Sequence, residues 1–182
     1  MGNSTYADYK RWDTKAERYE LIYGDAYAMS APNTCHQAIL TGLFGQFFIY
    51  LQGKPCKLFP APFDVRLFYE EDESDDTVVQ PDITVICDKT KIGPEGCRGA
   101  PDLVIEILSP SNTAIEMEHK RQLYQDAGVR EYWVIDPEYN SLFVYRFQAG
   151  MSPAYSSYKS TDTVSTAIFP DFSINLARVF AE

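Results

Sequence analysis

Two carboxylates in short apolar segments are the best candidates for chemistry in this sequence. Glu106 lies in the middle of LVIEIL, and Asp82 directly precedes ITVIC. An ionised carboxylate inside an apolar segment loses several kcal/mol of hydration unless a cation or strong hydrogen bonds replace the water. Glu106 is therefore expected to have a compensating partner, which could be a bound cation, an arginine or solvent. Taken alone, Asp82 is more typical of a turn-forming Pro-Asp pair than of a catalytic residue.

Together the two carboxylates favour a metal site. If their segments are neighbouring strands of one sheet, Asp82 and Glu106 come close enough to share one cation. Carboxylate oxygens suit Mg²⁺ or Mn²⁺, and the backbone carbonyl of Ile107 could be a further ligand. Water would complete the coordination, and one such water could attack a phosphodiester.

Lys120 is the third candidate, on a predicted helix. At 100° per residue it shares a stripe with Leu123 and Tyr124, so its stem is expected to face the apolar core. One interpretation is that Lys120 orients the attacking water or stabilises charge developing on the phosphate. The alternative is an i,i+4 ion pair with Glu116 on a half-exposed face, worth a few tenths of a kcal/mol.

Hydrophobic periodicity predicts the elements that would position these residues. Residues 19–29 are two short apolar segments around a Gly-Asp pair, which predicts a β-hairpin. Residues 33–52 begin with a possible N-cap and continue with apolar residues at helical spacing. Strands are predicted at residues 63–68, 83–87 and 103–108, and the last has apolar residues on both faces, as in a central strand covered on both sides.

The second half of the chain continues the alternation of helix and strand. Residues 113–127 are predicted to form a helix that Gly128 ends. Residues 132–135 and 142–147 are predicted strands, and residues 172–180 could be a final strand or a short helix. No glycine-rich phosphate loop follows a predicted strand, which excludes a Rossmann fold. The pattern predicts an α/β sandwich or mixed-sheet domain.

Length and composition fit a single domain over residues 1–182. The chain is 45% hydrophobic and 23% charged, and its length suffices to bury one core. No apolar stretch approaches the roughly 20 residues that cross a bilayer, and the N-terminus lacks a signal-like apolar region, so we expect a soluble cytoplasmic protein. The four cysteines are widely spaced without a CxxC pair and are predicted to be reduced, mostly buried thiols.

The formal net charge of −10 argues against an extended surface that coats nucleic acid. Such surfaces need many lysine and arginine side chains to displace counterions. Six of the acidic residues fall between Glu70 and Asp76. This run has no apolar anchor and is predicted to be an exposed, mobile loop that takes no part in the site.

Several segments, taken in order, resemble a known family. They are YELIYGDAYAMSAPNTCHQAIL, QPDITVIC, PDLVIEILSPSN and HKRQLYQDAGVREYWVIDPEYNSLFVYRF. This set resembles the restriction endonuclease-like domains of the PD-(D/E)xK nuclease superfamily, over about residues 19–147. The resemblance implies a mixed central β-sheet flanked by helices, preceded here by the hairpin, and a metal-dependent phosphodiesterase centre.

The resemblance also assigns individual residues. Asp82 matches the motif aspartate and Glu106 matches the (D/E) position, whereas Leu108 occupies the motif's lysine position. In this family the lysine comes from the following helix, where Lys120 matches it.

Two further residues match positions where this family tends to carry the same residue types. Glu20 could be an outer carboxylate of the site or an exposed strand residue, and His36 could be a site residue or a structural histidine at a helix start. Gln37 is a weaker candidate. Lys91 and Arg98 lie in a predicted loop that could meet a phosphate backbone.

Two functional hypotheses follow. The first is a metal-dependent endonuclease acting on DNA, with Asp82 and Glu106 as ligands of Mg²⁺ or Mn²⁺ and with Lys120 acting on the water or the transition state. A symmetric homodimer is expected by analogy with restriction-type nucleases. The second is a catalytically inactive nuclease-fold protein that serves as an interaction or regulatory module, with the acidity and the displaced lysine reflecting lost activity.

Overall fold

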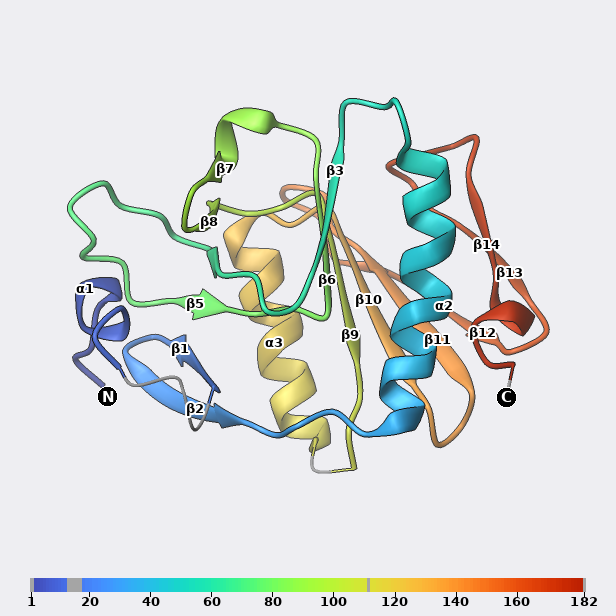
Figure 1. The fold of residues 1–182 in the computed structure, drawn as a ribbon, viewed down its shortest axis with the longest axis horizontal. Helices are drawn as coiled ribbons and strands as arrows, with labels where there is room; N and C mark the ends of the chain where they lie inside the picture. The colour runs from blue at the N-terminus through green and yellow to red at the C-terminus, as the bar shows by residue number, and fades with distance from the viewer. Residues whose placement is uncertain (1, 13–17, 111, 182) are drawn as a thin grey trace.

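A six-stranded sheet lies between two long helices in this computed structural model, which describes residues 2–12, 18–110 and 112–181 (Figure 1). The helices are α1 (Tyr6–Tyr9), α2 (Thr34–Leu51) and α3 (Ala114–Ala127), with short 3-10 turns η1 (Lys89–Lys91) and η2 (Leu176–Arg178). The strands are β1 (Arg18–Ile22), β2 (Asp25–Met29), β3 (Lys57–Pro60), β4 (Val65–Arg66), β5 (Val78–Val79), β6 (Ile83–Ile86), β7 (Ile92–Gly93), β8 (Gly96–Arg98), β9 (Leu103–Ile107), β10 (Glu131–Asp136), β11 (Ser141–Arg146), β12 (Ala154–Lys159), β13 (Thr163–Ser165) and β14 (Ser173–Asn175). The domain predicted over the whole chain thus includes residues 1, 13–17, 111 and 182, which lie outside the described residues.

The described strands form two six-stranded sheets and one small pair. The central sheet has the order β12-β11-β10-β9-β6-β3, the N-terminal sheet has the order β2-β1-β5-β4-β8-β7, and β13 pairs with β14. In the central sheet β9 runs parallel to β10 and antiparallel to β6. The predicted mixed central sheet flanked by helices is confirmed, and the predicted hairpin, β1 and β2, forms one edge of the N-terminal sheet.

Strand β9 is buried over its whole length, as predicted for a central strand. Its side chains alternate between the two faces of the sheet. Leu103, Ile105 and Ile107 pack into the core beneath α2, and Val104 packs into the core beneath α3. Alternation therefore directs Glu106 to the face that α3 covers.

The two long helices begin and end where the sequence predicts. The side chain of Asn33 accepts a hydrogen bond from the backbone N–H of His36 at the start of α2. Thr113 and Glu116 form a capping box at the start of α3, and Gly128 ends it with a left-handed φ of +91°. No helix in the described part of the chain is long and apolar enough to cross a membrane.

Some strands differ from the prediction. Of residues 63–68, only Val65 and Arg66 form a strand, and β3 precedes them without having been predicted. Strand β12 was also missed, because its alternation of exposed and half-buried residues carries little hydrophobic signal. The tail at residues 172–180 contains both predicted alternatives, β14 followed by the η2 turn.

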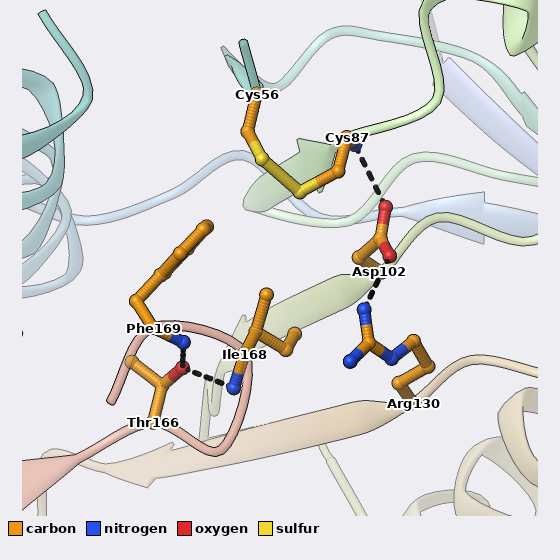
Figure 2. The surroundings of a disulfide bond; sticks show 7 residues. All are labelled: Cys56, Cys87, Asp102, Arg130, Thr166, Ile168 and Phe169. Carbon is orange, nitrogen blue, oxygen red and sulfur yellow. Dashed lines mark hydrogen bonds and ion pairs between the residues drawn. A yellow bond between two sulfur atoms is a disulfide. The ribbon is translucent and has the colours of Figure 1, made fainter. Parts of the chain in front are cut away.

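The prediction that all four cysteines are reduced is wrong for two of them, because Cys56 and Cys87 form a disulfide (Figure 2). Strands β3 and β6 pair antiparallel with Lys57 opposite Ile86, so one further step brings the two cysteines face to face. This contact depends on strand register, which cysteine spacing does not reveal. The other two are free thiols, Cys97 buried and Cys35 exposed.

The acidic run is not the simple exposed loop that the sequence predicts. Asp75 is 4% exposed and forms an ion pair with Arg66, which is also buried. The backbone carbonyl of Asp75 accepts a hydrogen bond from Tyr6 N at 2.7 Å, which ties the run to α1. Within the run, Glu70, Glu71, Asp72 and Ser74 are exposed as expected, whereas Glu73 and Asp76 are half-buried.

Candidate active site

A cleft of about 700 Å³ lies between the β1–β2 hairpin and the N-terminal parts of α2 and α3. All five predicted site side chains and Ile107 line it: Glu20, His36, Asp82, Glu106 and Lys120. Gln37 lines the cleft as well. Lys91 and Arg98 lie elsewhere, where Lys91 donates to the carbonyl of Ala100 at 2.7 Å and the Arg98 guanidinium lies over the ring of Tyr69.

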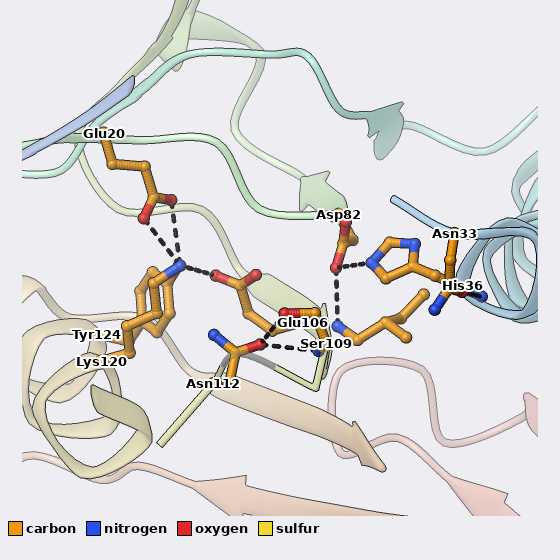
Figure 3. Close-up of polar contacts among 10 residues, drawn as sticks. Glu20, Asn33, His36, Asp82, Glu106, Ser109, Asn112, Lys120 and Tyr124 are labelled. Carbon is orange, nitrogen blue, oxygen red and sulfur yellow. Dashed lines mark hydrogen bonds and ion pairs between the residues drawn. The ribbon is translucent and has the colours of Figure 1, made fainter. Parts of the chain in front are cut away.

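Adjacent strands bring Asp82 and Glu106 together. Ile83 of β6 is opposite Ile105 of β9, and continuing this register by one residue puts Asp82 opposite Glu106. Residues directly opposite each other in an antiparallel pair point to the same face, with Cβ atoms about 5 Å apart. Both carboxylates line the cleft (Figure 3).

Asp82 is held by two donors at the same oxygen. Its Oδ2 accepts a hydrogen bond from Ile107 N at 2.7 Å and lies 3.2 Å from Nε2 of His36 (Figure 3). Burial lowers the pKa of His36, but the hydrogen bond to Asp82 and the charges of Asp82 and Glu106 outweigh it, so the pKa is raised overall.

Lys120 joins two carboxylates from different sheets. Its Nζ is 2.9 Å from Glu106 Oε1 and 3.0 Å from Glu20 Oε2. The alternative pairing of Lys120 with Glu116 is not what the structure shows, because Glu116 accepts a hydrogen bond from Thr113 N at 2.7 Å and caps α3. Burial lowers the pKa of Lys120, but the charges of Glu106 and Glu20 raise it above its ordinary value, so the ammonium is charged at neutral pH.

Glu106 is the most perturbed carboxylate of the cleft. Burial raises its pKa to about 7; the charge of Lys120 lowers it, and those of Glu20 and Asp82 raise it. Perturbed carboxyl groups of this kind concentrate at functional sites.

Tyr124 and Gln80 complete the network, and neither was predicted as a site residue. The Tyr124 hydroxyl donates to Glu106 Oε1 at 2.6 Å, and Gln80 N donates to Glu20 Oε1 at 3.0 Å. Tyr124 lies one helical turn after Lys120, so the shared stripe was a signal that could have identified it. Gln80 acts through its backbone, which no side-chain pattern reveals.

The donor set fits a divalent cation in part. The hydrogen bonds of Asp82 fall on Oδ2 and those of Glu106 fall on Oε1, so within the described residues Oδ1 and Oε2 have no hydrogen-bond partner. Two free carboxylate oxygens from adjacent strands are suitable ligands for Mg²⁺ or Mn²⁺. No three His, Cys, Asp or Glu side chains among the described residues form a group that could hold a metal ion, so backbone carbonyl and water ligands would be needed.

Comparison with known proteins gives a consistent result. The model of the Uma2 family, described as "Putative restriction endonuclease", matches residues 6–177. An uncharacterized protein of Synechocystis sp. (strain ATCC 27184 / PCC 6803 / Kazusa) is 27% identical over 118 residues, or 64% of this chain and 60% of that protein. The match therefore spans less than two thirds of the relative's length.

A solved structure shares the fold. The crystal structure of "a putative nuclease belonging to DUF820" from Anabaena variabilis ATCC 29413 superimposes with a TM-score of 0.76 over 98% of each chain, at 20% sequence identity. A likeness at this level of identity shows a common fold, and the chemistry of the cleft has to be argued from its own residues.

Proposed function

Because the chain belongs to the Uma2 family of putative restriction endonucleases, we propose that it hydrolyses phosphodiester bonds of DNA with Mg²⁺ or Mn²⁺ held by Asp82 and Glu106. The observation that carries this proposal is the pair of carboxylates at neighbouring positions of β6 and β9, where Asp82 directly precedes β6. Both line one cleft, and each has one oxygen that accepts no hydrogen bond from the described residues. The carbonyl of Ile107 is the further protein ligand of the proposal. We also propose the symmetric homodimer that the sequence analysis expects.

The residues around the two carboxylates fix them for this task. Ile107 N and His36 hold Asp82 at Oδ2, and Tyr124 and Lys120 hold Glu106 at Oε1, so the remaining oxygen of each carboxylate is available to a cation. When bound, such a cation supplies Lewis-acid activation of a water and neutralises phosphate charge.

Lys120 supplies a positive charge at the same place. It is charged, it lies partly buried between Glu106 and Glu20, and it lines the cleft. A fixed ammonium aimed at the position where negative charge develops stabilises the transition state more than the ground state. Lys120 thereby takes the part of the motif lysine that Leu108 replaces, and Glu20 and Gln80 keep it in place.

The proposal is tested by cation binding and by cleavage. We expect Mn²⁺ to raise the melting temperature of the wild type by mass action, and Asp82→Asn and Glu106→Gln to lose this increase. Nicking of supercoiled plasmid with Mg²⁺ or Mn²⁺ should be lost in the same variants. Asp25→Asn is the matched control, because this carboxylate lines the same cleft but is exposed and lies outside the ligand pair.

The alternative is an inactive nuclease-fold protein, and the replacement of the motif lysine by Leu108 is the observation that favours it. It predicts no nicking by the wild type with either cation. It also predicts that Mn²⁺ raises the melting temperature of neither the wild type nor Glu106→Gln, because the two carboxylates would then hold no cation.

A further inference from the structure

One face of the β1–β2 hairpin forms a wall of the cleft beside the proposed centre. Glu20 of β1 is directly opposite Tyr27 of β2, so the two side chains stand on the same face of the hairpin. Arg18 is opposite Met29 on that same face, one step further along. All four residues line the cleft, so Tyr27 lies one strand outward from the carboxylate that holds Lys120.

The Tyr27 ring is available to a ligand. Tyr27 is 50% exposed, β2 is the edge strand of its sheet, and the ring stacks on no other ring among the described residues. Arg18 likewise has no ion-pair partner in the described part of the chain. A free aromatic face beside a free guanidinium is the combination that binds one nucleotide, with the base stacked on the ring and the phosphate at the arginine.

The charge of the cleft argues against a duplex in it. Arg18 and Lys120 are the only lysine or arginine side chains among the described residues that line the cleft, and Lys120 is already paired with two carboxylates. Five carboxylates line the same space: Glu20, Asp25, Asp82, Glu106 and Glu116. A protein that binds the phosphate backbone of duplex DNA needs many lysine or arginine contacts along both strands. Stacking on an aromatic ring needs few cations, because much of the binding energy comes from the base.

We propose that the substrate in the cleft is a single-stranded or locally unpaired DNA segment, with the base of a nucleotide near the scissile phosphate stacked on Tyr27 and an adjoining phosphate contacted by Arg18. This inference rests on the proposed nuclease function and specifies its substrate class. An unpaired base has both faces free for stacking, whereas a paired base has to be extruded first at a cost of a few kcal/mol.

Binding is measured without cleavage, by fluorescence anisotropy in EDTA, with a labelled mixed-sequence oligonucleotide offered as a single strand or as a blunt-ended duplex annealed from two complementary strands. We expect the single strand to bind at least about 10-fold more tightly than the duplex. Tyr27→Ala should weaken single-strand binding by about 10-fold, as expected for one lost base–aromatic stack, and Tyr27→Phe should restore it. The matched control is Tyr139→Ala, which removes a ring that is 73% exposed and lies outside the cleft.

Salt dependence provides a second readout. With one or two phosphate contacts, the logarithm of the single-strand binding constant should fall with the logarithm of salt concentration with a slope of roughly −1, and Arg18→Met should make it shallower. Equal affinity for duplex and single strand, or wild-type affinity in Tyr27→Ala, overturns the inference.

Nicking and binding together separate the inference from the proposed function. If the protein nicks plasmid but binds single strands no better than duplex, the proposed nuclease function stands and the proposed substrate class is wrong. If single-strand binding depends on Tyr27 but the protein cleaves nothing in Mg²⁺ or Mn²⁺, the nucleotide subsite stands and the proposed nuclease function is wrong.

Discussion

Two ion pairs of this protein differ in whether both oxygens of the carboxylate accept hydrogen bonds. Arg66 and Asp75 pair beneath α1, with side chains 5% and 0% exposed. Lys120 and Glu106 pair at the floor of the cleft, with side chains 19% and 12% exposed. Both clusters place a cation against a carboxylate away from bulk water, so burial alone does not distinguish a structural pair from a functional one.

The Arg66 cluster is complete. Both carboxylate oxygens of Asp75 accept hydrogen bonds from the guanidinium, which also donates to the carbonyl of Glu70 at 2.8 Å. The rings of Tyr6 and Tyr69 lie on the guanidinium, 3.8 and 4.4 Å from its central carbon. Such a cluster stabilises the fold and leaves no carboxylate oxygen for a ligand.

The Lys120 cluster is incomplete. Its contacts to Glu106 fall on one oxygen, and the other oxygen has no hydrogen bond within the described residues. Burial raises the pKa of Glu106 to about 7, a shift that reflects a charge without full compensation. The difference suggests that a buried charge becomes available for chemistry when its partners leave an atom facing a cleft.

The largest expected effect on stability comes from removing the charge of Arg66 from the complete cluster. Arg66→Met leaves Asp75 buried without a counter-charge, and we expect it to lower the free energy of unfolding by about 3–5 kcal/mol. Urea denaturation measures this loss, with Glu71→Gln in the exposed part of the same acidic run as a control. Any Mn²⁺-dependent stabilisation should be retained in the folded fraction, and its disappearance would mean that the two clusters are coupled.

The next effect concerns the incomplete cluster. Lys120→Met removes the charge and keeps the length of the side chain, and we expect cleavage to fall by about 10²-fold or more, because the group acts on the transition state. Mn²⁺ should bind equally well or more tightly, since a positive charge next to Glu106 is lost. Single-turnover cleavage and a Mn²⁺ titration measure the two effects separately.

A different pattern would assign Lys120 to the fold. Lower stability with an unchanged cleavage rate would make it a structural partner of Glu20 and Glu106, and the assignment to the motif lysine would be wrong. In that case the cleft cluster would resemble the Arg66 cluster, and the comparison between them would no longer hold.

Local patterns in the sequence predicted the elements that carry the site. Hairpin, helix and strand signals located β1, β2, α2, β6, β9 and α3, and the ordered segments identified the family that the family model confirms. The interior position of Glu106 indicated a compensated charge, and the helical stripe placed Lys120 towards the core. These inferences succeeded because they depend on periodicity and burial within one segment.

Contacts between distant segments could not be predicted in the same way. Lys120 meets Glu20 across 100 residues of sequence, and the Cys56–Cys87 disulfide depends on the register of β3 and β6. Composition marked the acidic run as solvated, yet Asp75 is buried because Arg66 of β4 reaches it. The roles of the site residues, the cation and the DNA substrate are predictions that the experiments above address.

The smallest expected effect comes from an ion pair on the same helix as Lys120 in which the carboxylate is exposed. Glu118 is 63% exposed at its side chain and lies 2.6 Å from Arg121. We expect Glu118→Gln to lower the free energy of unfolding by only about 0.5 kcal/mol, because water screens the pair, and to leave cleavage and Mn²⁺ binding unchanged.

The hydrogen bond from Arg121 lowers the pKa of Glu118, so this stabilisation exists above the ordinary glutamate pKa and disappears as the pH falls through the lowered value. Urea denaturation of both proteins at neutral pH and in acid, below the ordinary glutamate pKa, should therefore show a small difference that decreases as the pH falls. If Glu118→Gln lowered the free energy of unfolding as much as Arg66→Met, or slowed cleavage, an exposed carboxylate of α3 outside the cleft would also be important for stability or activity.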